Sequence, residues 1–403
     1  MTANSKISTR SEPPRGAITR LAFHLAYKNL MGAGLRTWLS VGILSFVFVL
    51  IIFYQGYVEG FYQNSIDENI AWEYGGGQLL YKDYDPYDAF TLQDGHGKIP
   101  ATDTKDLVPI LIRQASIYPQ GRLMPVLVKG IEVAQNTVKL PTQLLQQSSA
   151  EYPVIIGKRM AASVNLKKGD QVMLRWRDKN GSFDAGNVTI AGIFDTDVPN
   201  VDIGQIWMPL KKLWAMTDMK GQATLFIANN NYEQKNLPKW KFKTQDELLT
   251  GIRALEKMDK ITGVIIYLVL LAIAMLAVFD TQVLSIFRRQ QEIGTYISLG
   301  MTRKQVLGLF TAEGCMHSIL GVLVGFIYGV PIFIYFTRQG IGTPAAVDNL
   351  GISAGKRIFP DFSPELIIGT AVLIIVSTTI VSFLPARKIA KMNPVDALKG
   401  KLQ

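Results

Sequence analysis

Three ionisable residues, Asp280, Glu313 and His317, interrupt segments that are otherwise almost free of charge. Glu313 and His317 are four residues apart, a spacing that places both side chains on one face of a helix. Ionisable groups in apolar helices are costly, and they serve either as proton relays or as polar contacts between helices. The contact interpretation is favoured because Asp280 and Glu313 fall near the ends of their apolar segments, where water can reach them.

The sequence lacks the common motifs of hydrolytic and metal chemistry. It contains no G-x-S-x-G, no H-E-x-x-H and no paired-cysteine spacing, and its three histidines are scattered along the chain. Gly95-His96-Gly97-Lys98 lacks the Ser or Thr and the glycine frame of a nucleotide-binding loop. Asp195, Asp197 and Asp202 could suggest a cation site, although solvated loop carboxylates are the commoner outcome. We therefore expect no catalytic residue, no metal site and no cofactor bound by this chain itself.

Four apolar segments must position these groups: residues 38–57, 261–287, 306–336 and 366–384. Each is long enough to cross a hydrocarbon core about 30 Å thick, which takes roughly 20 helical residues. Buried helices of soluble proteins are usually shorter, so four such runs in one chain predict four transmembrane helices. The first segment is interpreted as an uncleaved anchor, because a long segment precedes it and no A-x-A-like site follows it.

Basic residues are distributed unevenly among the segments that flank these spans. The N-terminal segment 1–37, the short loop 288–305 and the tail 385–403 are rich in Lys and Arg, whereas the loop 337–365 balances its basic residues with acidic ones. Positively charged flanks stay on the cytoplasmic side. Both termini are therefore predicted to be cytoplasmic at the inner membrane. The net charge of +10 is explained by this topology, which removes nucleic acid as an expected partner.

Residues 58–260 have a different pattern, with short alternating or apolar runs separated by Gly, Pro and Asp. The predicted strands are residues 77–81, 125–131, 154–156, 171–176, 188–194, 205–208 and 224–228, and the predicted short helices are residues 158–164 and 210–216. The predicted fold class is an α-helical membrane protein with four transmembrane helices and a mixed α/β extracytoplasmic domain between spans one and two. Residues 245–260 are predicted to form a helix that runs directly into the second span.

The loop between the second and third spans, residues 288–305, reads RRQQEIGTYISLGMTRKQ. Ile293, Tyr296, Ile297 and Gly300 recur at i, i+3, i+4 and i+7, which predicts a short amphipathic helix. Gly300 suits the position just after the helix end. From the spacing alone, a helical hairpin at the lipid interface explains this run as well as a docking helix does.

This run, together with Val306, resembles the ER-x-x-EIG-x-x-x-A-x-G-x-x-x-x-x-I signature of the FtsX-like permease family, which includes MacB-type exporters and lipoprotein-releasing transporters. It departs from that signature at Arg288, Ser298 and Val306, where the family often has Glu, Ala and Ile. The tail 384–399 is similar to the family's PA-R-x-A-x-x-x-P-x-x-AL-R ending. Residues 21–39 resemble the amphipathic helix that leads into the family's first span.

The resemblance implies a non-catalytic permease subunit that converts ATP hydrolysis by a separate cytosolic ATPase into movement of the external domain. ATP and Mg would be bound by that ATPase, and a second permease protomer would complete a homodimer or heterodimer. The residues implied in ATPase coupling lie in the loop helix and the tail: Arg289, Glu292, Ile293, Gly294, Tyr296, Ile297, Leu299, Gly300, Arg387 and Lys388.

Residues 154–172 and 190–210 are similar to the external domain of lipoprotein-releasing permeases, so lipoprotein release from the inner membrane is the first expectation. MacB-type subunits share much of this pattern. Export of a small molecule, peptide or glycolipid with a periplasmic adaptor is therefore an alternative. A signalling or cell-division regulator that acts on a periplasmic hydrolase is another, although cell-division members have a smaller external domain.

Overall fold

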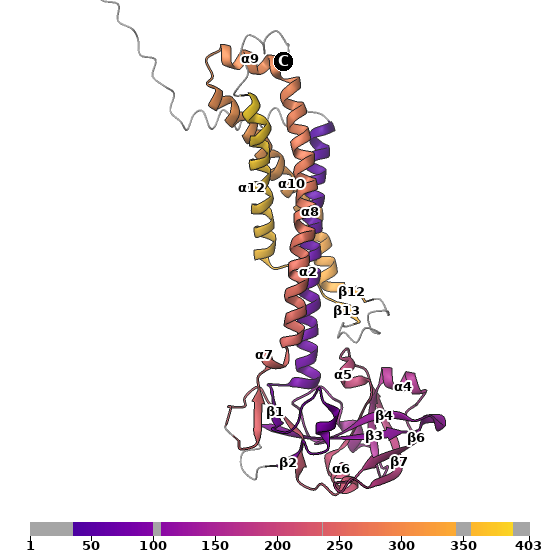
Figure 1. Cartoon of the computed structure of the whole chain (residues 1–403). Helices are drawn as coiled ribbons and strands as arrows, with labels where there is room; N and C mark the ends of the chain where they lie inside the picture. Colours follow the sequence, from indigo (N-terminus) through magenta and orange to yellow (C-terminus); the bar gives the residue numbers. More distant parts are fainter. Residues whose placement is uncertain (1–34, 100–105, 236, 344–355, 390–403) are drawn as a thin grey trace, which may run out of the picture. The chain divides into compact units, whose positions relative to one another are not determined.

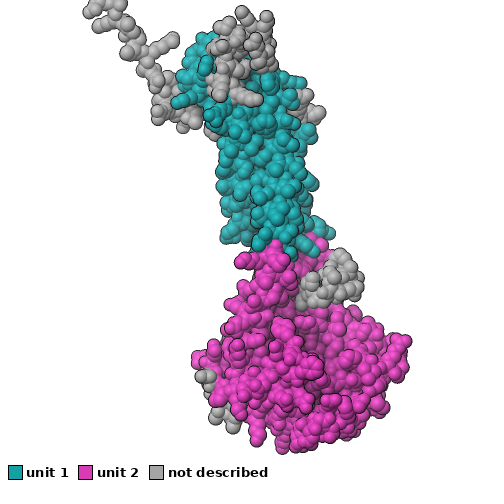
Figure 2. Space-filling model, viewed as in Figure 1, with its two compact units in different colours: residues 1–59, 259–340, 360–403 teal, residues 60–258, 341–359 magenta. Residues whose placement is uncertain are grey.

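The structure is a computed structural model, and it describes residues 35–99, 106–235, 237–343 and 356–389. The predicted helix before the first span and the last part of the predicted tail motif lie largely outside the described residues. The chain divides into two units, which are coloured separately in Figure 2. Unit 1 comprises residues 1–59, 259–340 and 360–403, and unit 2 comprises residues 60–258 and 341–359.

Four long apolar helices form most of unit 1 (Figure 1). They are α2 (Leu35–Asn69), α8 (Thr250–Arg288), α10 (Arg303–Gln339) and α12 (Pro364–Ile389). Each is long and apolar enough to cross a membrane, which confirms the predicted four-helix class. α2 and α8 extend well beyond the apolar segments that predicted them, and both continue along the chain into residues of unit 2.

A face of small residues brings α10 close to α2. A Cβ added at Gly321 would lie 2.9 Å from Leu44 Cβ, and one added at Gly325 would lie 2.7 Å from Phe48 Cδ1. A Cβ added at Gly329 would lie 2.8 Å from Val49 Cγ2. The glycines recur every four residues, so they lie on one helix face and let the two backbones approach.

Unit 2 is built on a sheet of nine strands in the order β11-β1-β10-β3-β4-β8-β5-β7-β6. These strands are β1 (Gln78–Tyr81), β3 (Leu107–Ile117), β4 (Met124–Ile131), β5 (Pro153–Gly157), β6 (Gln171–Arg177), β7 (Phe183–Phe194), β8 (Gln205–Pro209), β10 (Leu225–Ala228) and β11 (Trp240–Lys243). β6 also pairs with β3, with Ser116 opposite Arg175. The run from β3 to β6 therefore closes into a six-stranded ring, which β10, β1 and β11 extend as an open sheet.

Short elements complete unit 2. The helices and helical turns are η1 (Ile70–Tyr74), η2 (Ala89–Leu92), η3 (Pro119–Gly121), α3 (Gln143–Gln146), α4 (Lys158–Val164), α5 (Pro199–Asp202), α6 (Leu210–Thr217) and α7 (Gln245–Leu248). Two-residue strands pair as β2 (Gly97–Lys98) with β9 (Gln222–Ala223) and as β12 (Ile341–Gly342) with β13 (Arg357–Ile358). The mixed α/β class predicted for this region is therefore confirmed.

One strand of unit 2 was not predicted, and one predicted helix is interrupted near its start. β3, which pairs with three other strands, was not predicted, because Pro109 and the polar pair Arg113 and Gln114 break its apolar pattern. The helix predicted for residues 245–260 does run directly into the second span from Thr250 onward, but its first turn is separate, since α7 ends before the buried Leu249 and α8 begins at Thr250. α7 has its own capping box, so the short segment is a separately capped turn.

Candidate functional site

α9 (Gln290–Ser298) is the short helix that follows α8 and precedes α10 in unit 1 (Figure 1). Gly300 N–H donates to Ile297 O and Met301 N–H donates to Tyr296 O, both at 3.0 Å. Gly300 has φ +98°, in the left-handed region that favours glycine. This pair of bonds with a left-handed glycine is a Schellman motif, and it fixes the turn from α9 into α10.

The apolar face of α9 packs against the other helices of unit 1. Ile293 is fully buried in a cluster with Ile286 of α8, Phe310 of α10 and Ala386 of α12. Tyr296, Ile297 and Met301 add partly buried contacts to this cluster. Burying a side chain such as Ile293 contributes about 1.5–3 kcal/mol, so the contact holds α9 firmly against the bundle.

The opposite face of α9 is exposed. It consists of polar side chains and one large apolar side chain: Gln291, Glu292, Thr295, Ser298 and Leu299. Leu299 is 78 % exposed, an unusual state for a leucine beside so well packed a helix. A firmly held helix with one free face is suited to contact with another protein.

Arg289, the residue before α9, makes two ion pairs. Its Nε lies 2.7 Å from Glu292 Oε2, and its Nη1 lies 3.0 Å from Glu313 Oε2 on α10. Glu313 is 3 % exposed, whereas Glu292 is 56 % exposed. Burial lowers the pKa of Arg289, but the pairs with Glu292 and Glu313 outweigh this and raise it, so the guanidinium stays charged.

The predicted intramembrane polar residues do not form one group. Glu313 has a cationic partner in Arg289, as a contact between helices requires. His317 is buried, and its Nδ1 lies 2.6 Å from the backbone oxygen of Glu313. This contact is with the backbone of Glu313 and not with its carboxylate. Asp280 is exposed on α8 and takes no part in the ion pairs described for Arg289.

Gly314 is a point of close contact between helices of unit 1. A side chain at Gly314 would overlap Ser382 of α12 and would approach Gln282 of α8 at 3.4 Å. α8, α10 and α12 therefore converge at this glycine, one residue after Glu313.

The two predicted tail cations are only partly described. Arg387 is exposed near the end of α12, next to Ala386, which packs in the same cluster as Ile293. The side chain of Lys388 lies outside the described residues.

Two of the three aspartates that could have bound a cation, Asp195 and Asp202, are engaged by other groups of the protein. Asp195 pairs with Lys158 at 3.4 Å and with Lys356. Asp202 is fully buried and accepts hydrogen bonds from the backbone N–H of Arg159 and Met160, the first turn of α4. Among the described residues, no group of three or more His, Cys, Asp or Glu could hold a metal ion.

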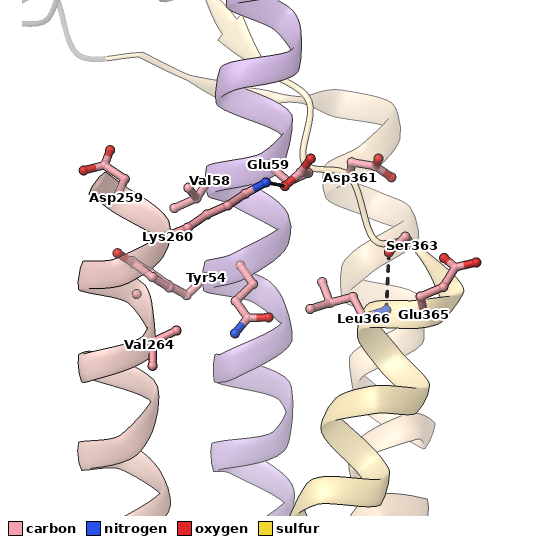
Figure 3. Close-up of a pocket in the computed structure, with 12 residues that line it drawn as sticks. Tyr54, Val58, Glu59, Asp259, Lys260, Val264, Asp361, Ser363, Glu365 and Leu366 are labelled. Atoms are coloured by element: carbon pink, nitrogen blue, oxygen red, sulfur yellow. Dashed lines mark hydrogen bonds and ion pairs between the residues drawn. The ribbon is translucent and has the colours of Figure 1, made fainter. Parts of the chain in front are cut away.

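A cavity of about 550 Å³ lies between α2, α8 and the start of α12 in unit 1 (Figure 3). Its lining comes from three stretches of chain: Tyr54, Gln55, Val58 and Glu59; Asp259, Lys260, Gly263 and Val264; and Asp361, Ser363, Glu365 and Leu366. No local pattern in the sequence indicates this cavity, because its charged residues lie at the ends of separate apolar segments.

Comparison with known proteins finds a family match in the C-terminal part of the chain. Residues 264–394 match the family "FtsX-like permease C-terminal". The chain is similar to the macrolide export ATP-binding/permease protein MacB of Neisseria gonorrhoeae, with 27 % identity over 233 residues. That match covers 52 % of this chain and 33 % of MacB.

The chain is also similar to an uncharacterized ABC transporter permease of Methanocaldococcus jannaschii, with 25 % identity over half of each chain. It therefore spans a third to a half of the length of these two relatives. Among solved structures, the periplasmic region of MacB from Actinobacillus actinomycetemcomitans matches with a TM-score of 0.28 and 9 % identity, over 47 % of this chain and 97 % of that one.

Proposed function

We propose that this chain is the membrane subunit of an ABC transporter, because residues 264–394 match the FtsX-like permease C-terminal model. In this proposal the ATPase is a separate cytosolic protein that binds ATP and Mg. The chain itself is a multi-pass membrane protein, and catalysis is assigned to the partner.

The observation that carries the proposal is the arrangement of α9, which is buried on one face and exposed on the other. A push on Glu292 or Leu299 at the exposed face would reach α8, α10 and α12 through Ile293 and Arg289. Rigid elements transmit small displacements because packed interfaces shift between discrete arrangements rather than deforming continuously. Gly294, Tyr296, Ile297 and Gly300 would shape this helix, and Arg387 and Lys388 would add contacts from the tail.

The orientation follows from the charge distribution. α9 and both termini are assigned to the cytoplasm, and residues 58–260 to the opposite side of the inner membrane. A second permease protomer, identical or different, would complete the transporter. In this arrangement the ATPase would act on α9, and the external unit would act on the cargo.

Two cargo classes fit this scheme. The pattern of residues 154–172 and 190–210 supports lipoprotein release, whereas the relative from Neisseria gonorrhoeae is named as a macrolide exporter, which supports export of a small molecule with a periplasmic adaptor. Purification of the chain with its partners, followed by identification of bound molecules, separates the two. Bound lipoprotein supports the first, and a bound small amphiphile or an adaptor supports the second.

Glu292→Lys tests the coupling assignment. The reversed charge would repel Arg289 and change the exposed face of α9, so we expect loss of ATPase copurification and of ATP-dependent function, with membrane insertion unchanged. Glu151→Lys, an equally exposed reversal in unit 2, is the matched control and should retain both. Normal copurification and function in Glu292→Lys would remove α9 from the coupling route.

A further inference from the structure

The loop between β1 and β2, residues 82–96 and hereafter the aromatic loop, holds two aromatic side chains in solvent. Tyr87 is 94 % exposed and Phe90 is 91 % exposed, and no other large apolar side chain in the described part of the chain is exposed to this extent. Aromatic side chains are enriched in protein interfaces, because they bury a large apolar area at little cost in side-chain freedom. These two rings are therefore candidates for contact with another protein chain.

Hydrogen bonds hold the aromatic loop in one conformation. Asp85 Oδ1 accepts from Tyr87 N–H and Asp88 Oδ1 accepts from Phe90 N–H, both at 2.9 Å. The buried Arg113 of β3 donates from Nη1 to two backbone oxygens of the loop, at 3.0 and 3.3 Å. A segment that is already ordered loses little conformational entropy on binding, so the two rings are presented ready for contact.

Another cavity, of about 520 Å³ and hereafter the arginine cavity, lies on the outer face of the six-stranded ring. Its lining comes mainly from β3, β4, β6 and β7, which lie together in Figure 1. Arg175 of β6 is paired with Ser116 of β3, which is paired with Pro125 of β4, and Arg177 of β6 is paired with Phe183 of β7. Residues two apart on a strand share a face, so both arginines line the cavity from the same side.

The two arginines surround one aromatic ring. Arg175 Cζ lies 3.9 Å and Arg177 Cζ lies 4.4 Å from the centre of the Phe183 ring. Two guanidinium groups held so near to each other repel, and an anion between them would relieve the repulsion. All the lining residues lie in the described part of the chain, and none of them is an Asp or Glu. The arginine cavity is therefore suited to an aromatic group that brings negative charge with it.

The aromatic loop and the arginine cavity are neighbours on unit 2. Gln114, which lines the cavity, donates from Nε2 to Ala89 O of the loop at 2.8 Å. The rings of Tyr87 and Phe90 nevertheless do not line the cavity of their own chain, and both remain almost fully exposed. Two complementary surfaces that lie side by side on one chain can bind their counterparts reciprocally across a two-fold axis.

The charges of these two surfaces are opposite. Lys82 in the loop is paired with the exposed Asp83 at 3.7 Å, so the exposed Asp85 and Asp88 leave a negative charge beside the two rings. The cavity supplies two guanidinium groups and no carboxylate. Opposite potentials on facing surfaces favour association and fix the register of an interface. The aromatic loop of one chain therefore has the side chains and the charge that suit the arginine cavity of another.

We propose that unit 2 binds a second copy of this chain through the aromatic loop and the arginine cavity. Tyr87 and Phe90 of each copy occupy the cavity of the other. There they stack on the guanidinium groups of Arg175 and Arg177, which also face the aspartates of the loop. This inference rests on the proposed function in one respect, since it takes the second permease protomer to be identical and to have the same orientation in the membrane.

The test is chemical cross-linking between two differently tagged copies of the full chain in the membranes of cells that produce both. Both copies carry Cys315→Ser, which removes the single natural cysteine. One copy carries Ala89→Cys in the loop and the other carries Ser116→Cys in the cavity, so both rings and both arginines are kept. With a short bismaleimide we expect a product that contains both tags. Asn136→Cys, at an exposed loop residue of unit 2, replaces Ser116→Cys in the control pair and should give no such product.

Two double variants test the two halves of the contact. Tyr87→Ala with Phe90→Ala keeps the hydrogen bonds of the loop, because these use backbone N–H groups and the aspartates. Arg175→Glu with Arg177→Glu reverses the charge of the cavity. Each double variant, placed in both copies, should reduce the cross-linked product by about tenfold or more, as expected for residues that dominate an interface.

Matched controls separate this contact from general effects on the protein. Leu255→Ala removes a side chain of unit 2 that is 51 % exposed, and Lys211→Glu with Lys220→Glu reverses two exposed charges elsewhere in unit 2. Both controls should leave the yield of the product unchanged. Elution of every variant as a single species in detergent shows that a lost cross-link does not come from misfolding.

Three results would overturn the proposal: no product with both tags, equal product from the Asn136→Cys pair, or a product unaffected by both double variants. Attachment of Ala89→Cys to a different protein in place of the second copy would assign the aromatic loop to that protein and would also overturn it. Coupling is judged separately, by ATPase copurification with Glu292→Lys. A failed cross-link and a failed coupling test therefore reject different proposals.

Discussion

Arg289 Nη1 lies 3.0 Å from Glu313 Oε2, and this ion pair joins the residue just before α9 to the interior of α10. The same guanidinium also pairs with the exposed Glu292 through its Nε. One side chain thus links a buried carboxylate of the bundle to a carboxylate on the proposed docking face. The two ion pairs should contribute very differently to stability, because only one carboxylate is shielded from water.

The first prediction compares these two carboxylates. Glu313→Gln removes the buried charge that balances Arg289, and breaking a buried pair costs about 3 kcal/mol. Glu292→Gln removes an exposed pair and should cost about 1 kcal/mol or less. Thermal unfolding of the full chain in detergent should therefore show a clearly larger loss for Glu313→Gln. Equal losses for the two variants would contradict the role given to Arg289.

The second prediction concerns the convergence of α8, α10 and α12 at Gly314. Gly314→Ala places a methyl group against Ser382, and such overpacking costs typically about 1–3 kcal/mol. Gly308→Ala is the matched control on the same helix, because open space surrounds Gly308. Thermal unfolding should show destabilisation by Gly314→Ala alone, and Ser382→Gly should restore part of the stability. A Gly314→Ala protein as stable as the control would show that the helices do not meet there.

The third prediction concerns pH and two neighbouring aspartates in unit 2. The hydrogen bond from Lys356 lowers the pKa of Asp195, whereas burial raises the pKa of Asp197. The stabilising contribution of charged Asp195 is present above the pKa of the unfolded chain and is lost as the pH falls through the lower folded value. Asp197 has the opposite effect on stability. Its pKa is raised in the folded state, so charged Asp197 destabilises the fold above that pKa, and this destabilisation is lost as the pH falls through it.

Asp195→Asn should therefore lower stability at neutral pH and should match the unchanged protein in strong acid. Asp197→Asn should be neutral or slightly stabilising at neutral pH. Asp195 is partly exposed, so each effect should be below about 1 kcal/mol after solvent screening. Thermal unfolding as a function of pH checks both signs, and a loss of stability in Asp197→Asn at neutral pH would contradict the burial argument.

The sequence predicted the helical architecture well because its signals are local. An apolar run long enough to span a membrane depends only on consecutive residues, and the four-residue spacing of Gly321, Gly325 and Gly329 is a local pattern of the same kind. The turn at Gly300 was predictable for the same reason, since a glycine after an amphipathic run is a typical helix end. The apolar face of α9 was also visible at i, i+3 and i+4.

The missing parts depend on contacts between distant residues. The pairing of Arg289 with Glu313 joins residues 24 positions apart, and neither residue type identifies the other as its partner. β3 was missed because Pro109 conflicts with its strand pattern, although pairing with β10 places Pro109 opposite Phe226. The cavity combines three segments that are adjacent only in the folded chain. Such features require tertiary structure, which local spacing does not contain.

The closure of the ring between β3 and β6 also affects how readily unit 2 associates with other copies of itself. A strand at the end of a sheet exposes unpaired N–H and C=O groups, which can recruit strands from other molecules. In the described sheet, β11 is the end strand that no closure protects, and it carries Lys241 and Lys243. Charged lysines on an edge discourage strand-to-strand association. Many copies packed side by side should therefore resist aggregation through this sheet.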